Sequence, residues 1–300
     1  MPEAELTPPA NGLLTAPPGE GRRAVHFAGS TILTEWQGRP AGALVEFVFG
    51  RTAQGHPATA QVTFRLSPAA GGLLRLENSA GQPLNASPAM AAVALMEQAT
   101  YHLLERATGG LALHAGLIVR DGRALLLPGT SGSGKSTLAL WLGRHGWQCL
   151  ADEVVFIPTG GPSVEGGRQA AIRASGLARP AHLKPASAAA CPQLIGPGSL
   201  PLETGGWLVP PDHADYAQSE GLPVAGILFP HFQPGAQPQV QPLSRASAAA
   251  QLAEVLVNAR NLPGHGFAAL VALARTVPAW AAAYGGFEGL VEKIEGAARD

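Results

Sequence analysis

The sequence predicts an α/β protein, and three observations support this fold class. A short apolar run, ALLLP at 124–128, leads directly into a glycine-rich loop at 129–134. A helix-prone stretch follows from Lys135 to about Arg144, and strand-like and helix-prone runs then continue toward the C-terminus. Before this region, several short β-prone runs are separated by Gly and Pro. We therefore expect an α/β domain preceded by a small β-rich region.

The composition excludes several classes of protein. The chain has 300 residues, of which 46% are hydrophobic and 14% charged, and its formal net charge is −1. This charge balance provides no field that would attract nucleic acid or an anionic membrane. No apolar run is long enough to cross a membrane, and the N-terminal stretch lacks the features of a signal peptide, so we expect a cytoplasmic protein. Cys149 and Cys191 are too few and too far apart for a disulfide framework or a cysteine zinc site.

Three regions are expected along the chain. Residues 1–22 are rich in Pro, Gly and Ala and are typical of a disordered leader. Residues 23–108 contain four β-prone runs, which predict a small antiparallel β region, and then one long helix that begins at Ser87-Pro88. Residues 109–300 form the main domain. The β-prone runs are AVHFAG, ALVEFVFG, ATAQVTFRLS and GLLRLE.

The main domain begins with a predicted β-hairpin. Two apolar runs, LALHAGLIVR and RALLLP, flank Asp121-Gly122, a dipeptide typical of tight hairpin turns. After the loop and its helix, WQCLA predicts a short strand that ends at Asp152-Glu153. Residues 158–223 predict loops and short elements, GILFP predicts a strand, and Ser244 begins a helix of about 244–261. From Gly266 onward the sequence predicts two further helices.

The glycine-rich loop matches a phosphate-binding (Walker A) loop, G-x-x-x-x-G-K-[ST], at every position. Glycines allow a tight turn that directs backbone N–H groups at phosphate oxygens, and the N-terminus of the following helix attracts the same anion. Lys135 would reach the β- and γ-phosphates, and the Ser136 hydroxyl would bind Mg²⁺. The loop therefore predicts binding of ATP with Mg²⁺ by Gly129, Thr130, Ser131, Gly132, Ser133, Gly134, Lys135, Ser136 and Thr137.

An acidic pair and a histidine flank this loop in the sequence. Asp152-Glu153 follows Lys135 after only one helix and one short strand, where the chain returns to the edge of the sheet that carries the loop. A carboxylate there can accept a proton from an acceptor hydroxyl, as the catalytic aspartate of a kinase does. His114 lies shortly before Gly129, in the strand expected to pair with the loop-bearing strand. It is suited to proton transfer near neutral pH, although a lone histidine in an apolar strand is more often structural.

These separated elements resemble the HPr kinase/phosphorylase catalytic domain. The matching residues are His114-Ala115, the loop, Arg144-His145-Gly146 and Ala151-Asp152-Glu153. The chain is most similar to the shorter HPr-kinase-related proteins that are encoded in peptide-modification gene clusters, loosely over 110–295. The resemblance implies a phosphate-loop kinase core of the HPr kinase/PEP carboxykinase type, which is a mixed β-sheet with flanking helices.

The resemblance also implies roles for individual residues. Asp152 would act as the catalytic base on a serine hydroxyl of a peptide or protein, His114 would support it, and Lys135 with the loop amides would hold the phosphates. Ser136, Asp152 and Glu153 would hold Mg²⁺. The family has Asp where this chain has Glu153, and its later E-x-R-G-L-G segment is absent. Arg179 and Lys184 are the best substitutes for the positive charge of that segment.

Three functions remain open at this point. The first is an HPr-kinase-like serine kinase that acts on a peptide or protein. The second is a small-molecule kinase for free serine or another metabolite, although the D-x-D motif usual in such kinases is absent. The third is a nucleotide-gated binding module that transfers no phosphoryl group. HPr kinases form rings, so a homo-oligomer is a further alternative that the sequence leaves open.

Overall fold

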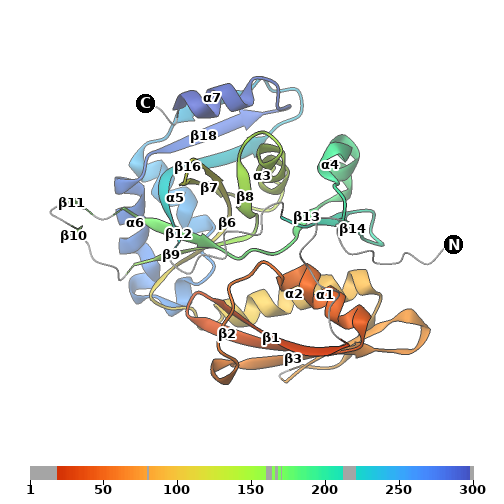
Figure 1. Cartoon of the computed structure of the whole chain (residues 1–300). Helices are drawn as coiled ribbons and strands as arrows, with labels where there is room; N and C mark the ends of the chain where they lie inside the picture. Colours follow the sequence, from red (N-terminus) through yellow and green to blue (C-terminus); the bar gives the residue numbers. More distant parts are fainter. Residues whose placement is uncertain are drawn as a thin grey trace. The chain divides into compact units, whose positions relative to one another are not determined.

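The chain folds into two compact units that are discontinuous in sequence. The computed structural model describes residues 19–79, 81–159, 164–165, 168–169, 171–211 and 221–297 (Figure 1), so the expected leader at 1–22 lies almost wholly outside the described residues. The first unit comprises Met1–Arg106 and Ala178–Ala217, and the second comprises Ala107–Leu177 and Gln218–Asp300. The first boundary is close to the expected one at 108, but the segment at 178–217 groups with the first unit instead of the main domain.

The first unit contains a five-stranded sheet with the strand order β1-β2-β3-β4-β5. Neighbouring strands are antiparallel except β2 and β3, which are parallel, so the expectation of a purely antiparallel region was wrong. The reason is a helix that connects these two strands, because a parallel pair needs a crossover connection. The strands are β1 Glu20–Phe27, β2 Ser30–Gln37, β3 Val62–Pro68, β4 Leu74–Asn78 and β5 Leu84–Ala86.

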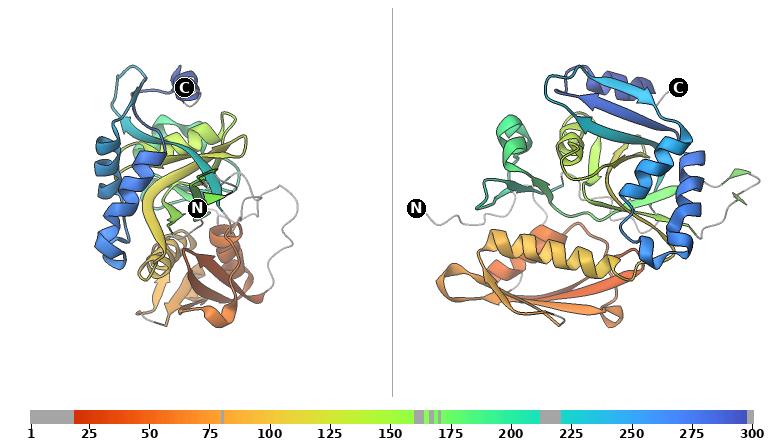
Figure 2. Two further views of the ribbon diagram at one scale, coloured as in Figure 1. Left: turned by 90° about the vertical axis from the view of Figure 1, so that its left-hand side faces the viewer. Right: turned by 180° about the vertical axis from the view of Figure 1, so that it is seen from behind.

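Two helices, α1 (Arg39–Phe49) and α2 (Pro88–Leu104), cover one face of this sheet (Figures 1 and 2). Helix α2 begins as predicted, since the Ser87 side chain accepts a hydrogen bond from the Met90 amide. The prediction of a strand for ALVEFVFG was wrong, because this run forms helix α1. The region therefore contains two helices and not the single helix that was expected. The buried residues of α1 recur at the spacing of one helix face, and this periodicity outweighs the β propensity of the run. They include Ala41, Leu44, Val45, Val48 and Phe49.

The segment at 178–217 forms a small sheet of its own. Its three strands pair in the order β13-β15-β14, and none of their described pairings joins another sheet. This self-contained pairing is the physical reason why the segment separates from the main domain. Its elements are β13 Ala181–Leu183, α4 Pro185–Ala190, β14 Leu200–Pro201 and β15 Trp207–Val209.

The second unit is built on an eight-stranded mixed sheet with flanking helices, which confirms the α/β class. Its strand order is β12-β9-β6-β7-β16-β18-β17, and β8 pairs with β6. The neighbours β7, β16 and β18 are parallel, whereas the other pairs are antiparallel. The strands are β6 Gly110–Arg120, β7 Arg123–Pro128, β8 Gln148–Ala151, β9 Val154–Pro158, β12 Arg173–Gly176, β16 Leu222–Phe232, β17 Gln239–Pro242 and β18 Ala279–Tyr284.

The predicted hairpin is confirmed as β6 and β7. Their turn consists of Asp121 at φ 51° and Gly122 at φ 72°, the positive values that a tight hairpin turn of this type requires. The helix after the loop is also confirmed, as α3 (Lys135–Gly143). It packs against β6, β7 and β16, and its own residues Leu138 and Leu142 are buried in the hydrophobic core.

The C-terminal part of the second unit differs from the prediction in two places. The expected helix at 244–261 ends early, as α5 (Arg245–Glu254), because the β-branched run that follows it pairs with β6: His114 N–H donates to Val255 O at 2.8 Å. The two helices expected after Gly266 are α6 (Phe267–Thr276) and α7 (Leu290–Ala297), but the missed strand β18 separates them. Its sequence, AWAAAY, has weak β propensity, and its parallel pairing with β16 overrides that preference.

Helices α5 and α6 lie side by side in the second unit (Figure 2). No described helix is both long enough and apolar enough to cross a membrane. The remaining elements are short. They are β10 Val164–Glu165, β11 Arg168–Gln169 and the 3₁₀ turns η1 Pro57–Thr59, η2 Ala70–Gly72, η3 Pro192–Leu194, η4 Ala259–Asn261 and η5 Pro263–Gly266.

Candidate functional site

The glycine-rich loop joins strand β7 to helix α3. Gly132 and Gly134 adopt φ values of 92° and 91°, in the left-handed region that disfavours other residues. The Ser133 amide donates to the Thr130 carbonyl at 3.2 Å, which closes a tight turn inside the loop. The Gly129 amide donates to His114 O at 3.3 Å, so the loop begins against strand β6. This is the strand–loop–helix arrangement that the motif requires.

Five N–H groups of the loop donate to no backbone carbonyl among the residues that the structure describes. Amides at a helix start and in a tight glycine-rich turn form a concave donor surface that suits an anion. The five amides belong to Thr130, Gly132, Gly134, Lys135 and Ser136.

Lys135 is a buried cation at the first position of α3. Its exposed fraction is only 5%, and its Nζ donates to the backbone carbonyl of Asp152. An ammonium group has three N–H donors, and among the described residues no carboxylate lies within ion-pair distance of this one. Buried charges are normally paired, so Lys135 has unused capacity to bind an anion.

Asp152 is a buried carboxylate in the connection between β8 and β9. Its neighbours are fixed by the sheet, because Ala151 pairs with Leu117 and Val154 pairs with His114. The residue is 3% exposed, and its carboxylate has no hydrogen-bond or ion-pair partner among the residues that the structure describes. Buried carboxylates rarely lack a partner in a purely structural role. The chain was predicted to return at Asp152 to the edge of the sheet that carries the loop, and the hydrogen bond from Lys135 Nζ to the Asp152 backbone carbonyl shows this return.

The side chains of His114 and Glu153 contact each other at the edge of the sheet that carries the loop. His114 Nε2 lies 3.2 Å from Glu153 Oε1, and both side chains are partly exposed. The backbone adds to this arrangement, since the Ala115 amide donates to Glu153 O at 3.1 Å. The sequence predicted that His114 would support Asp152, whereas its side-chain partner in the structure is Glu153. A role of His114 in support of Asp152 stays a prediction.

Two of the three predicted Mg²⁺ ligands, Ser136 and Asp152, have side chains that fit a magnesium site. The described residues contain no group of three or more His, Cys, Asp or Glu that could hold a metal by itself. Magnesium at a phosphate loop typically takes only one or two protein ligands and completes its shell with phosphates and water. The Ser136 hydroxyl and the Asp152 carboxylate have no described side-chain partner and fit that role, whereas the Glu153 carboxylate is already paired with His114.

The two predicted charge stabilisers are in the other unit. Arg179 and Lys184 belong to the segment at 178–217, and Lys184 precedes helix α4 as its N-cap residue. Arg179 is half-buried and Lys184 is exposed. The site as described in the second unit does not include them, and their role stays a prediction.

Two aromatic residues contact the loop and were not predicted as site residues. The Tyr284 hydroxyl donates to Gly134 O at 3.2 Å, and the Phe232 amide donates to Ser133 O at 3.0 Å. They come from the carboxyl ends of β18 and β16, which are parallel to β7, so all three strands end at the same edge. A Cβ at Gly134 would lie 2.5 Å from Tyr284 Oη, so this glycine is required by close approach as well as by its φ. No local sequence pattern could have identified contacts between residues so far apart in the chain.

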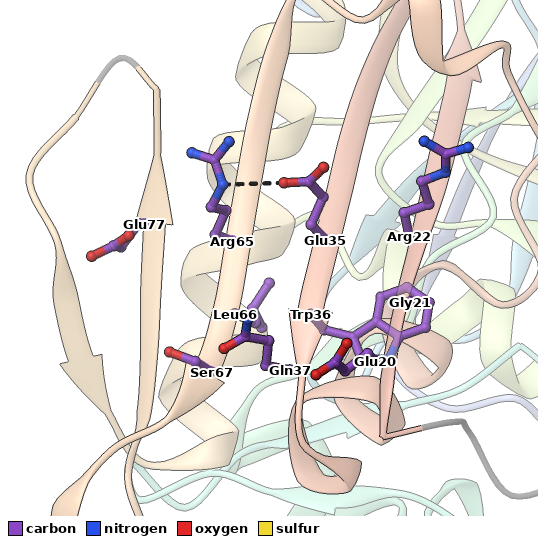
Figure 3. Close-up of a pocket in the computed structure, with 10 residues that line it drawn as sticks. All are labelled: Glu20, Gly21, Arg22, Glu35, Trp36, Gln37, Arg65, Leu66, Ser67 and Glu77. Carbon is purple, nitrogen blue, oxygen red and sulfur yellow. Dashed lines mark hydrogen bonds and ion pairs between the residues drawn. The ribbon is translucent and has the colours of Figure 1, made fainter.

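The first unit carries a separate groove on the face of its sheet (Figure 3). Charged residues cross the strands there in alternating sign, because Arg22 pairs in register with Glu35, Glu35 with Arg65, and Arg65 with Glu77. Arg65 Nε lies 3.1 Å from Glu35 Oε2, and Arg75 Nε lies 2.5 Å from Glu77 Oε1. These are paired, solvent-exposed charges of the kind that commonly cover an open sheet face.

Comparisons with known proteins give no family assignment. A scan against protein-family models found no match, and a search of curated proteins found no significant match.

Proposed function

We propose that the second unit is an ATP-dependent kinase with a phosphate-loop core of the HPr kinase/PEP carboxykinase type, which transfers the γ-phosphoryl group to a serine hydroxyl of a peptide or protein. The observation that carries the proposal is the pair of buried charges, Lys135 and Asp152, next to a loop in which five amides donate to no backbone carbonyl among the described residues. Two buried charged groups without ionic partners destabilise a protein unless a ligand uses them. The resemblance to HPr kinases supplies the reaction class, and a cytoplasmic location is part of the proposal.

Each residue would contribute one part of the transfer. The backbone amides of Thr130, Gly132, Gly134, Lys135 and Ser136 and the Lys135 ammonium would bind and orient the phosphates. Magnesium, when held by Ser136 and Asp152, would neutralise phosphate charge. The Asp152 carboxylate would accept the proton of the serine hydroxyl as its oxygen bonds to the γ-phosphorus and the bond to the β-phosphate oxygen breaks.

Glu153 and His114 would hold Asp152 in position. Glu153 follows Asp152 directly, and its carboxylate is paired with His114 Nε2 at 3.2 Å. The backbone of this segment is also fixed, through the Ala115 amide and through the ammonium of Lys135. A base held at two neighbouring points loses little orientation when the acceptor binds.

Binding and transfer need separate measurements. Titration calorimetry with ATP and Mg²⁺, and with inorganic tripolyphosphate and Mg²⁺, should show binding of both ligands if the loop holds phosphates. Incubation with γ-labelled ATP and either serine-containing peptides or free serine then identifies the acceptor. Label in a peptide serine supports the proposal. Label only in free serine supports the small-molecule alternative, and ATP binding without any transfer supports the binding-module alternative. Absence of both kinds of binding would overturn all three.

A further inference from the structure

An exposed aromatic ring lies directly beside the phosphate loop. Phe232 is 44% exposed at the carboxyl end of β16, and its backbone N–H donates to Ser133 O at 3.0 Å. The other large hydrophobic residues exposed in the described part of the second unit, Val257 and Phe267, have no backbone hydrogen bond to the loop. Single exposed apolar residues are common on protein surfaces, but the hydrogen bond from the Phe232 backbone to the loop suggests that this one has a function.

The backbone on both sides of Phe232 is fixed. The Gln233 amide donates to Tyr284 O at 2.8 Å, and the Gly285 amide donates to Ala236 O at 2.9 Å. The two segments approach so closely that a Cβ at Gly285 would lie 2.5 Å from Ala236 N. The Phe232 ring is therefore presented from a rigid position, which reduces the entropy cost of binding a ligand against it.

One side of the ring is supported by a second aromatic residue. The Phe232 and Tyr284 ring centroids are 5.8 Å apart at 66°, and Tyr284 is 1% exposed. Tyr284 is itself fixed to the loop by its hydrogen bond to Gly134 O. This support leaves the rest of the Phe232 ring open to solvent and available for stacking.

The strand order separates this ring from the catalytic side of the loop. Strand β7, which leads into the loop, lies between β6 and β16. Asp152 and His114 belong to the β6 side, through the pairing of β6 with β8 and β9. Phe232 and Tyr284 belong to the β16 and β18 side. With the γ-phosphate directed toward Asp152, the remainder of a nucleotide would extend toward the side that carries Phe232.

We infer that Phe232 is the stacking platform for the base of the nucleotide, held in place by Tyr284. This inference rests on the proposed function, because it assumes that the loop binds the phosphates of the same nucleotide. Stacking on an aromatic side chain requires only the π-face of a base, so the platform would accept adenine and guanine alike.

The test compares ATP with inorganic tripolyphosphate, which has no base. Calorimetric titrations of the full chain with Mg²⁺ should show that Phe232→Ala weakens ATP and GTP binding by about 5- to 150-fold, the range for loss of one base stack. Tripolyphosphate affinity should change by less than about twofold, since no contact with phosphate is removed. Phe267→Ala removes an even more exposed ring (68%) from the same unit and is the matched control that should leave both affinities unchanged.

The outcomes distinguish the inference from the proposed function. If the unmodified protein binds tripolyphosphate and ATP but Phe232→Ala leaves ATP affinity unchanged, or weakens both ligands equally, the stacking role is overturned and the proposed function stands. An increase only in the KM for the acceptor also overturns it, since the ring would then contact the acceptor. If the unmodified protein binds neither ligand, both ideas are overturned.

A second variant, Phe232→Trp, distinguishes loss of stacking from a folding defect in Phe232→Ala. Phe232→Trp keeps an aromatic face, so ATP affinity should be maintained or improved. The fluorescence of this variant minus that of the unmodified protein should be quenched by ATP and not by tripolyphosphate. Equal quenching by the two ligands, or none by ATP, would contradict stacking.

Discussion

The loop edge of the second unit and the open sheet face of the first unit both carry charged residues, but the two regions differ in the burial and pairing of these charges. On the sheet face, Arg65 and Glu35 form an exposed ion pair at 3.1 Å, and Arg75 pairs with Glu77. At the loop edge, Lys135 and Asp152 are both buried, and neither has an ionic partner among the described residues. Exposed pairs contribute little energy, whereas buried unpaired charges are costly.

This difference separates a solvated surface from a site for a ligand. The sheet face is complete without a ligand because its charges satisfy one another or contact water. Among the described residues, five loop amides have no backbone acceptor and the Lys135 ammonium has no carboxylate partner, and a bound polyphosphate would supply both acceptors and counter-charge. We therefore expect the sheet face to tolerate substitution. Substitutions at the loop edge should reduce activity and ligand binding more than they reduce stability.

The largest effect is expected for Asp152→Asn. Loss of the base should reduce phosphoryl transfer by about 10²- to 10⁴-fold, measured with γ-labelled ATP. Calorimetry with Mg²⁺ should find a much smaller change in ATP affinity, because the asparagine side chain keeps an oxygen that can bind Mg²⁺ and the contacts of the loop and of Lys135 with the phosphates remain. The melting temperature should not fall, because the substitution removes a buried charge and keeps the shape of the side chain. Asp121→Asn, in the exposed β6–β7 turn, is the matched control and should leave transfer unchanged. Transfer near the original rate in Asp152→Asn would contradict the assignment of the base.

Lys135→Ala is expected to have the next largest effect, on phosphate binding. Hydrogen bonds to charged groups contribute about 1.5–3 kcal/mol, so calorimetric ATP affinity should fall by about 10- to 150-fold. Tripolyphosphate should be affected equally, because the ammonium contacts phosphates and not the base. The exposed Lys293 on α7 provides a control, and Lys293→Ala should change neither affinity. Equal affinity in Lys135→Ala and the original protein would show that the buried ammonium serves the fold alone.

A pair of glycine substitutions tests whether the close approach of Tyr284 to Gly134 excludes a larger side chain at that position. Gly134 and Gly146 have similar φ values of 91° and 84°, but a Cβ at Gly134 would lie 2.5 Å from Tyr284 Oη, and one at Gly146 would meet nothing within 4 Å. Gly146→Ala should cost only the left-handed strain of about 1–2 kcal/mol. Gly134→Ala should cost about 1–3 kcal/mol more, from overpacking. Urea unfolding measures both, and equal losses would mean that Tyr284 moves aside freely.

The smallest effect is expected on the sheet face of the first unit. Arg65→Ala removes an exposed ion pair and should change the free energy of unfolding by no more than about 0.5–1 kcal/mol. Phosphoryl transfer and ATP affinity should stay the same. A clear rise in the KM for the acceptor in this variant, with ATP affinity unchanged, would break the comparison, because it would assign the sheet face to acceptor binding.

Local sequence patterns predicted the secondary structure correctly where it depends on residues close together in the chain. The hairpin follows from Asp121-Gly122 between two apolar runs, and helix α2 follows from Ser87-Pro88. The pattern failed for α1, where strand-forming residues recur at helical spacing. It failed again for β18, an alanine-rich run that is a strand only because β16 lies beside it.

The sequence by itself determined the loop, its flanking strand and helix, and the return of the chain at Asp152-Glu153, because each depends on contacts within a few residues or on one short connection. Only the tertiary structure decided that Lys135 and Asp152 are buried without ionic partners, that Glu153 rather than Asp152 pairs with His114, and that Phe232 and Tyr284 contact the loop. These features depend on the strand order, which brings distant segments to one edge of the sheet. The spacing of residues along the chain does not encode that order.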